Sequence, residues 1–291
     1  MALSPRIEEW RRRGERIEFR GHAIHLMLRP GDGPLVVFLH GFPSSSYDWR
    51  ALLERLDPGR AVACFDFLGF GLSDKPPDHV YGLGWQADLT TEVVRRAGGG
   101  PVHLVAHDMG TSVATELMAR ELRGEAEIDV RGALLFNGSI LLHLACPTLG
   151  QRVLRGPAGP AFARLMSGWS FRRQFARIFS DEHPLTREEA DDQWELVAYG
   201  GGGRIAHRLI EYMNERERLT DRWHGAVRDW GGDLHLAWGL RDPVATPAVL
   251  AGLRELRPAA PVTEWPDLGH YPQIEDPARV AAAVERSLAG Y

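Results

Sequence analysis

Cysteine is scarce in this sequence, and its scarcity excludes a disulfide-stapled fold. Only two of the 291 residues are cysteines, Cys64 and Cys146, and neither belongs to a C-x-x-C pair. The 12 histidines form no mixed cluster with cysteine, so no metal site is expected. Both cysteines stand in apolar surroundings, which predicts two reduced thiols in the core of a cytosolic protein.

Long apolar runs are also missing. No stretch approaches the ~20 apolar residues of a membrane span, and residues 1–21 are charged throughout, with no apolar segment typical of a signal peptide. Both observations predict a cytoplasmic protein. The net charge is -5, and the 34 basic residues, nearly all arginine, are scattered along the chain. This pattern argues against nucleic acid or an anionic membrane as a partner.

Short apolar runs are present, and they alternate with helical patterns. Residues 18–28 alternate like an antiparallel strand, and 35–39, 61–65 and 101–106 read as buried parallel strands. Later strands are expected in 131–138, 234–239 and 261–270, with helices between them. The fold class is therefore α/β, with a mostly parallel central sheet and helices on both faces. Right-handed crossovers place the loops after the strands at one edge, where ligands bind.

One segment breaks this alternation. Residues 139–230 contain no clear strand but many helical patterns rich in arginine, tryptophan and phenylalanine. The simplest interpretation is a helical cap of residues 139–230 inserted into a core made of residues 1–138 and 231–291. Such a cap would roof the ligand-binding edge of the sheet.

The most informative motif is V-A-H-D-M-G-T at 105–111, where a strand becomes a helix across one tight turn. A nucleophile elbow needs small residues around the nucleophile, because strand and helix pack closely. The nucleophile position is Asp108, which disfavours esterase chemistry and favours attack on an alkyl carbon to form an ester. A purely structural role for Asp108, capping the helix, is the alternative that the motif alone leaves open.

An acid and a histidine follow Asp108 in the expected order. Asp242 and His270 each stand just after a predicted strand. His270 would activate the hydrolytic water, and Asp242 would orient the imidazole and stabilise its charged form. A third element is the turn His40–Pro43, which follows the first parallel strand. The N–H groups of Phe42 and Met109 could form an oxyanion hole, although the turn could equally be structural.

Taken together, HGFP, DFLGFGLSDKP, HDMG, the late RDP and GHYPQIEDP resemble the α/β-hydrolase superfamily, in the branch of epoxide hydrolases and haloalkane dehalogenases. The resemblance runs from about residue 18 to 288. NGSI, EYMNERERL and GHYPQIEDP look most like the mesoderm-specific transcript group. The resemblance implies hydrolysis through a covalent alkyl-enzyme ester, with no cofactor and with a small apolar organic substrate and water as partners.

The leaving group depends on residues around the nucleophile. Dehalogenases of this branch typically place a tryptophan and an asparagine where Met109 and Phe42 stand here, so both halide donors are missing. Epoxide hydrolases of the branch use cap tyrosines as acids, and Tyr212 matches one such position. We therefore predict epoxide hydrolysis to a vicinal diol. Haloalkane hydrolysis and a non-catalytic ligand-binding protein are the alternatives. Fluoroacetate-type cleavage would need arginines beside the nucleophile, and the elbow has none.

Four further residues are predicted to contact the substrate: His40, His143, Trp169 and Tyr199. His143 and Tyr199 are the candidates for a second acid in the cap, although the sequence favours a structural role for each. Trp169 could instead belong to the cap's own core. His107 precedes the nucleophile but should point away from it, because successive strand residues alternate between faces. The protein is expected to be a monomer or a homodimer.

Overall fold

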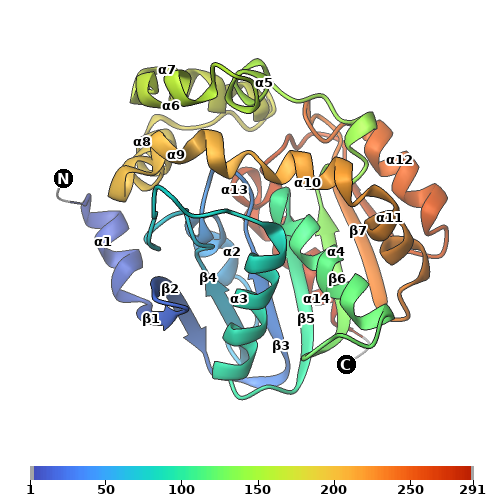
Figure 1. Cartoon of the computed structure of the whole chain (residues 1–291). Helices are drawn as coiled ribbons and strands as arrows, with labels where there is room; N and C mark the ends of the chain where they lie inside the picture. Colours follow the sequence, from blue (N-terminus) through green and yellow to red (C-terminus); the bar gives the residue numbers. More distant parts are fainter. Residues whose placement is uncertain (1–2, 290–291) are drawn as a thin grey trace.

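A computed structural model describes residues 3–289. Its eight-stranded sheet has the order β1-β2-β4-β3-β5-β6-β7-β8 (Figure 1). The strands are β1 (Glu15–Phe19), β2 (His22–Arg29), β3 (Asp32–Leu39), β4 (Arg60–Phe65), β5 (Pro101–His107), β6 (Asp129–Phe136), β7 (Asp233–Gly239) and β8 (Val262–Trp265). Strands β3 to β8 are parallel to their neighbours, and β2 joins β4 antiparallel. The predicted fold class is confirmed.

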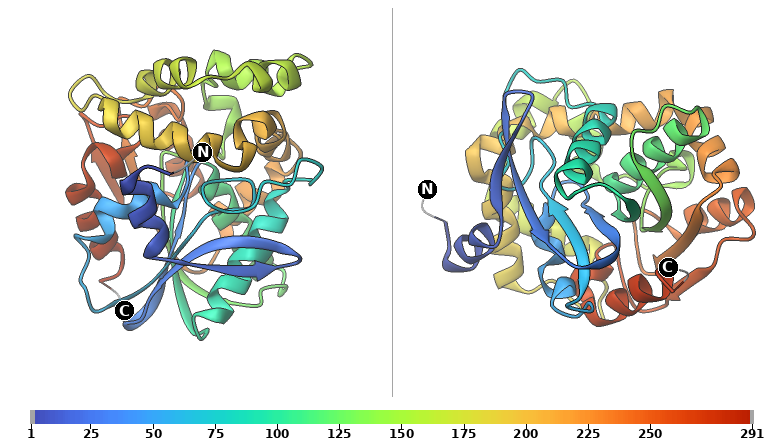
Figure 2. Two further views of the ribbon diagram at one scale, coloured as in Figure 1. Left: turned by 90° about the vertical axis from the view of Figure 1, so that its left-hand side faces the viewer. Right: turned by 90° about the horizontal axis from the view of Figure 1, so that it is seen from below.

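The first predicted strand is instead a hairpin. The segment 18–28 is divided between β1 and β2, which pair antiparallel around Arg20 and Gly21. Both turn residues have positive φ, 49° and 80°, as a tight two-residue hairpin turn requires. The alternating pattern continues through the turn, which is why the sequence does not reveal it. Figure 2 shows this hairpin extending along one side of the molecule.

Both faces of the sheet are buried because successive residues of each strand point to opposite sides. In β3, Val37 and Leu39 belong to one apolar cluster, and Val36 and Phe38 belong to the other. Helices α3 (Leu83–Arg96), α4 (Met109–Leu122), α11 (Thr220–Asp229) and α12 (Pro247–Leu256) cover the first face. Helices α1 (Pro5–Arg12), α2 (Arg50–Leu53) and α14 (Pro277–Ser287) contribute to the second, near the short α13 (Pro272–Glu275).

Between β6 and β7 the described chain contains helices but no strand. They are α5 (Leu149–Arg155), α6 (Gly159–Leu165), α7 (Gly168–Phe175), α8 (Arg187–Ala198), α9 (Gly202–Leu209), α10 (Tyr212–Arg218) and α11, with short 3-10 turns at Leu142–Leu144, Ala176–Ile178 and Tyr199–Gly201. A further 3-10 turn, Ser46–Trp49, precedes α2. Figure 1 shows α5–α7 stacked above α8–α10, over the carboxyl ends of the strands.

Helix α11 lies outside this roof, although the predicted cap extends to residue 230. It packs on α4 of the core layer, where Arg222 and the indole N–H of Trp223 donate to Glu116 at 2.9 Å. This buried, charge-assisted anchor is the kind of interaction that holds a helix firmly in place. We therefore propose that the roof ends before Thr220. No helix within residues 3–289 is long and apolar enough to cross a membrane.

The elbow requires a close approach of helix α4 to strand β3, which yields a testable prediction. A Cβ on Gly110 would lie 2.2 Å from the carbonyl oxygen of Leu39. Although alanine favours helix over glycine, we expect Gly110→Ala to lower the free energy of unfolding by about 1–3 kcal/mol, as overpacking of a core does. Urea unfolding measures this change.

The matched control is Gly231→Ala. No heavy atom lies within 4 Å of a Cβ built there, so its stability should stay within about 0.5 kcal/mol of the parent, as for ordinary surface substitutions. Equal midpoints for the two variants would contradict the close approach.

Candidate active site

Asp108 occupies the sharp turn between β5 and α4. Its backbone has φ 44° and ψ -109°, a conformation that costs of order 1–3 kcal/mol for a residue with a side chain. The hydroxyl of Thr111 donates to the carbonyl oxygen of Asp108 at 2.6 Å and helps to hold the turn. The carboxylate itself is not engaged in capping α4. The strained turn instead presents it at the carboxyl edge of the sheet, as a nucleophile elbow does.

The turn after β3 supplies a hydrogen-bond donor to this carboxylate. The Phe42 N–H donates to Oδ2 of Asp108 at 3.0 Å. The approach is close, since a Cβ on Gly41 would lie 2.8 Å from the Cβ of Asp108. Met109, the other predicted donor, is the first residue of α4. Phe42 therefore occupies the position expected of an oxyanion-hole donor.

Asp242 and His270 form a hydrogen-bonded pair. Nδ1 of His270 lies 2.7 Å from Oδ2 of Asp242, and both side chains are almost fully buried. The other carboxylate oxygen of Asp242 accepts from the N–H groups of Val244 and Ala245 at 2.7 and 3.0 Å. These bonds fix the carboxylate, which in turn fixes the imidazole so that Nε2 carries the reactive position.

Asn137, at the end of β6, is a residue that the sequence analysis missed. Its backbone φ is 46°. Its side-chain NH2 donates to Oδ2 of Asp242 at 2.8 Å, and its side-chain oxygen accepts from the Gly239 N–H at 2.9 Å. Asn137 thereby positions the acid from the neighbouring strand. Asn137 belongs to the NGSI segment, but the sequence does not distinguish an asparagine that positions an acid from one that only forms a turn after a strand.

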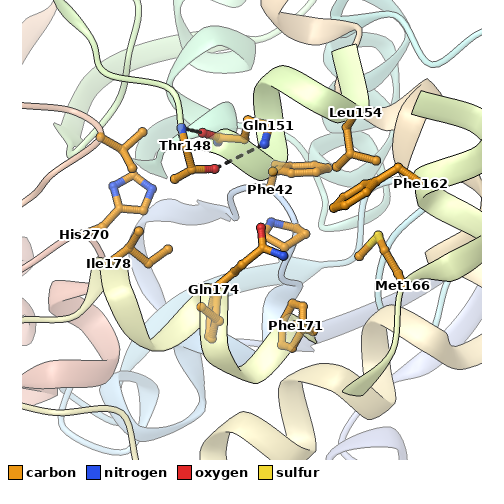
Figure 3. Close-up of a pocket in the computed structure, with 14 residues that line it drawn as sticks. Phe42, Thr148, Gln151, Leu154, Phe162, Met166, Phe171, Gln174, Ile178 and His270 are labelled. Atoms are coloured by element: carbon orange, nitrogen blue, oxygen red, sulfur yellow. Dashed lines mark hydrogen bonds between the residues drawn. The ribbon is translucent and has the colours of Figure 1, made fainter. Parts of the chain in front are cut away.

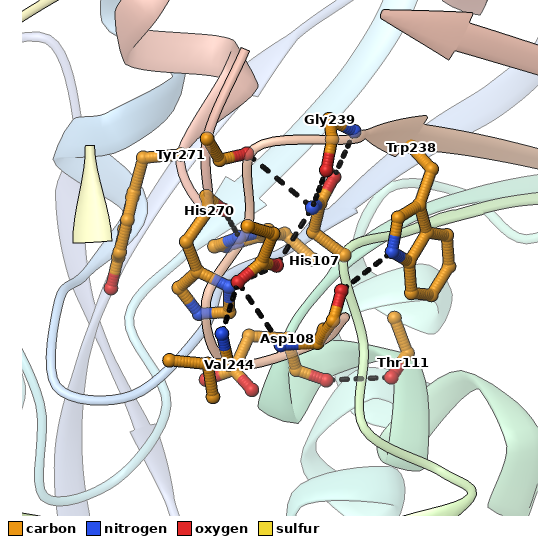
Figure 4. Close-up of polar contacts among 12 residues, drawn as sticks. His107, Asp108, Thr111, Trp238, Gly239, Val244, His270 and Tyr271 are labelled. Carbon is orange, nitrogen blue, oxygen red and sulfur yellow. Dashed lines mark hydrogen bonds and ion pairs between the residues drawn. The ribbon is translucent and has the colours of Figure 1, made fainter. Parts of the chain in front are cut away.

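His107 lies behind the site rather than in it, as strand alternation predicted. Its Nε2 donates to the carbonyl oxygen of His270 at 2.7 Å, and its Nδ1 accepts from Gln273 at 3.1 Å (Figure 4). Burial lowers the pKa of His107 far below its usual value, so the ring is neutral and this pattern of one donor and one acceptor is complete. The ring positions the backbone of His270.

The acid beside His270 determines its protonation. Burial opposes the charged imidazole, but the charge and hydrogen bond of Asp242, together with the charge of Asp108, outweigh burial and raise the pKa of His270. A raised pKa makes the neutral imidazole a stronger base. It also means that the base is lost as the pH falls through a value above that of a free histidine.

An arginine from the cap reaches the nucleophile. Arg216 of α10 is 1% exposed. Its guanidinium donates to the carbonyl oxygen of Asp108 and to Oγ of Ser112, both at 2.8 Å, and it lies 3.8 Å from Oδ1 of Asp108. The sequence analysis considered only the elbow, which contains no arginine, and therefore missed Arg216. Arg216 follows Tyr212 by one helical turn, and that spacing places both on one face.

Tyr212 is buried above Phe42 and the carboxylate. Its ring centroid lies 5.8 Å from that of Phe42 and 4.6 Å from the guanidinium carbon of Arg216. Burial, followed by the charge of Asp108, raises the pKa of Tyr212. The phenol therefore remains protonated at neutral pH and is able to donate a proton or a hydrogen bond.

A cavity of about 80 Å³ lies between the cap and the site, with His270 in its wall (Figure 3). Most of its lining is apolar, from Phe42, Pro43, Leu154, Phe162, Met166, Phe171, Phe175, Ile178 and Val244, and its polar side chains are Thr148, Gln151, Gln174 and His270. Thr148 and Gln151 bond each other at the start of α5, with the Thr148 N–H donating to the Gln151 side chain at 2.7 Å. The cavity suits a small apolar molecule.

The remaining predicted contacts do not line this cavity. His40 is fully buried; its Nε2 accepts from the Phe67 N–H, and its Nδ1 donates to the Gly41 carbonyl. His143 is exposed in the turn Leu142–Leu144, and the ring of Tyr199 lies 5.3 Å from the Lys75 ammonium. Trp169 is 66% exposed on the cap. The roles of these four residues as substrate contacts stay predictions. Cys146 is likewise exposed, whereas Cys64 is buried as predicted, and both are free.

No group of three or more histidine, cysteine, aspartate or glutamate side chains within residues 3–289 is arranged to hold a metal ion. The chemistry of the site is thus built from a carboxylate, an acid–histidine pair, a phenol and a guanidinium.

The acid–histidine pair gives a prediction on protonation. In Asp242→Asn the charge that stabilises imidazolium is removed while the ring stays buried, so the pKa of His270 should fall below its wild-type value. In the parent it should lie above about 6.5, the value of a free histidine. Titration of the ring nitrogens by 15N NMR measures both.

Asp129→Asn is the control, because Asp129 is exposed at the opposite end of β6. It should leave the His270 titration unchanged. A His270 ring that titrates alike in the parent and in Asp242→Asn would show that Asp242 does not set its charge.

Comparisons with known proteins agree with this geometry. A model of the alpha/beta hydrolase family matches residues 36–283. The hydrolase LipZ of Mycobacterium tuberculosis H37Rv is 52% identical over 280 residues, covering 96% of this chain and 97% of LipZ. The mesoderm-specific transcript protein of Mus musculus is 33% identical over 286 residues, covering 94% of this chain and 85% of that protein.

Among solved structures, the haloalkane dehalogenase DatA of Agrobacterium tumefaciens C58 superposes with a TM-score of 0.80. The match covers 95% of this chain and 96% of DatA, at 20% identity, so it bears on the fold alone. The family resemblance inferred from the motifs is confirmed: the chain belongs to the alpha/beta hydrolase family and is related to the mesoderm-specific transcript proteins.

Proposed function

We propose that this hydrolase opens a small apolar epoxide through a covalent ester on Asp108. The observation that carries the proposal is the placement of one strained, buried carboxylate between the Phe42 N–H and the Tyr212–Arg216 face of the cap. The acid–histidine pair completes the set needed to hydrolyse such an ester.

In the first step Oδ1 of Asp108 attacks a ring carbon, and the bond between that carbon and the epoxide oxygen breaks. Oδ2 is held by Phe42, so Oδ1 is the oxygen left to react. The departing alkoxide takes the Tyr212 proton, which its raised pKa has retained. The positive charge of Arg216 stabilises the phenolate that remains, because charges interact strongly in a site from which water is excluded.

In the second step His270 removes a proton from water, and the resulting hydroxide attacks Cγ of Asp108. The oxyanion that forms on the former carboxylate is stabilised by the Phe42 N–H. Its collapse breaks the bond between Cγ and the diol oxygen. That oxygen takes the remaining proton of the attacking water, which leaves the alcohol and the carboxylate, and the proton held by His270 passes to the phenolate of Tyr212 or to solvent. Asp242 stabilises the imidazolium in between.

The hydrogen-bond donors near the nucleophile determine which leaving group the site can stabilise. Halide release calls for donors such as an indole N–H or an asparagine NH2, and the side chains of Phe42 and Met109, the residues beside the carboxylate in the two turns, offer neither. A phenol supplies a proton, which an alkoxide needs and a halide does not. Haloalkane hydrolysis therefore remains the second candidate, and it shares every other step.

The nucleophile and base give the central prediction. His270→Gln removes the base of the second step only, so an apolar epoxide such as styrene oxide should leave its full mass on the peptide that contains Asp108. Intact-protein and peptide mass spectrometry detect this adduct. Asp108→Asn should form no adduct and should turn over more than 10³-fold more slowly, as expected for loss of a nucleophile.

Labelled water gives the matching check. In a single turnover in 18O water the label should enter Asp108 and not the first diol, because the diol oxygen comes from the carboxylate. Label found directly in the first diol would point to attack by water on the epoxide. An adduct from 1-bromobutane but not from styrene oxide would favour the halide.

Tyr212→Phe separates the two leaving groups. We expect the rate of ester formation from the epoxide to fall by roughly 10²-fold, the usual contribution of a general acid, because phenylalanine cannot protonate the alkoxide. Alkylation by 1-bromobutane needs no proton and should change by less than about threefold. Rapid-quench mass spectrometry of the His270→Gln background measures both rates.

Tyr81→Phe is the control for this variant. It removes a phenol that bonds the Pro76 carbonyl at 2.6 Å, outside the site, and should leave both rates unchanged. Equal losses for epoxide and bromide in Tyr212→Phe would indicate a packing role for the tyrosine.

A further inference from the structure

The outer surface of the cap combines exposed apolar side chains with cationic ones. Leu149 at the start of α5 is 78% exposed, and Trp169 in α7 is 66% exposed. With Val153, Arg173 and Arg177 they line a hollow of about 340 Å³, which we call the outer cap face. Large exposed apolar residues gathered with basic ones are uncommon on a monomer surface and mark an interaction site.

The charge of this region is one-sided. Seven arginines and no aspartate or glutamate occur between residues 130 and 180, in a chain whose net charge is -5. Of these arginines, two in the cap are neutralised: Arg155 by Glu217 and Arg172 by Asp191. Four others, Arg152, Arg164, Arg173 and Arg177, are exposed and have no ion-pair partner within residues 3–289. Two of them, Arg173 and Arg177, belong to the outer cap face, and Arg152 lies on α5.

Trp169 and Arg173 form the centre of the face. The guanidinium carbon of Arg173 lies 5.6 Å from the ring centroid of Trp169. An amphipathic ring beside a solvent-facing guanidinium is suited to the boundary between lipid headgroups and acyl chains. Basic side chains at such a boundary are attracted to anionic headgroups.

The hollow also adjoins the substrate cavity. Thr148, Gly150, Phe162 and Gln174 line both spaces. Helices α5–α7, which carry the face, form the outermost layer over the site (Figure 1). An apolar molecule leaving a lipid surface would therefore meet the hollow first and the wall containing His270 second.

We propose that the outer cap face binds the surface of an anionic lipid bilayer. The expectation of no membrane partner rested on the basic residues of the whole chain, whereas residues 130–180 hold arginines and no acidic residue, so that expectation is replaced by this proposal. The binding does not depend on the chemistry at Asp108. An acidic protein or a second copy of the chain would meet the same charges, but neither requires apolar side chains around the mouth of a substrate cavity.

Vesicle sedimentation tests the proposal with the full-length chain. The parent should sediment with vesicles of 40% phosphatidylglycerol in phosphatidylcholine and remain in solution with phosphatidylcholine alone. Binding should fall at least tenfold between 0.1 and 0.5 M NaCl, because salt screens exposed charges. Leu149→Ser with Trp169→Ser, and separately Arg173→Gln with Arg177→Gln, should each weaken binding at least tenfold.

Matched controls carry the same changes elsewhere. Val80→Ser alters a residue that is 82% exposed outside the outer cap face, and Arg12→Gln with Arg123→Gln removes two exposed positive charges from α1 and the end of α4. All should bind as the parent does. Asp108→Asn should also bind normally, which keeps failure of this proposal distinct from failure of the catalytic one.

The depth to which Trp169 enters the bilayer gives a second readout. Lipids brominated on the acyl chains should quench the fluorescence of the parent, and Trp169→Phe should lose that quenching. Equal sedimentation with anionic and neutral vesicles, or unchanged binding of both double variants, would overturn the proposal. A parent that forms dimers abolished by the Trp169 substitution, and that ignores vesicles, would overturn it in favour of self-association.

Discussion

The rest of the structure depends on the contact between Arg216 and Asp108, which joins the cap to the core. A guanidinium that is 1% exposed needs partners for its donors, and it finds them in the backbone and side chain of the elbow. The same contact gives a buried carboxylate a counter-charge. The cap is thus anchored at Asp108 itself, so the roof and the elbow are built as one unit.

This arrangement imposes a compromise on the chemistry. A nearby cation weakens a carboxylate as a nucleophile, but it also stabilises negative charge that develops when a carbon–oxygen bond breaks. The Arg216 guanidinium donates a hydrogen bond to the Asp108 carbonyl oxygen at 2.8 Å and lies 3.8 Å from Oδ1. At that distance the attraction is weaker than in a direct hydrogen bond. In the proposed mechanism, Asp108 keeps a free oxygen while the developing alkoxide and phenolate meet a positive field.

The sequence was sufficient for the sheet, the elbow and the order of Asp108, Asp242 and His270, because each rests on local pattern: an apolar run, a turn and a polar residue after it. It was insufficient where chain-distant residues meet. Arg216 and Asn137 look like ordinary helix and loop residues until the fold brings them to Asp108 and Asp242. The exposure of Trp169 could not be predicted for a different reason, since the sequence does not show whether an aromatic residue on a helix faces inward or outward. The residue range of the cap, the reaction and its substrate were predictions from the sequence and remain proposals here.

Asn137 has a consequence for the cap as an insertion. The side chain bonds Gly239 and Asp242, which follow the whole helical segment in the chain, while Asn137 itself immediately precedes it. Asn137 therefore ties the residue just before the helical segment to the loop after β7, beneath the roof. Helices above this contact could lengthen, shorten or exchange over evolutionary time without disturbing the acid that bonds His270. Substrate range could thus diversify in the roof while the hydrolytic machinery below it stays the same.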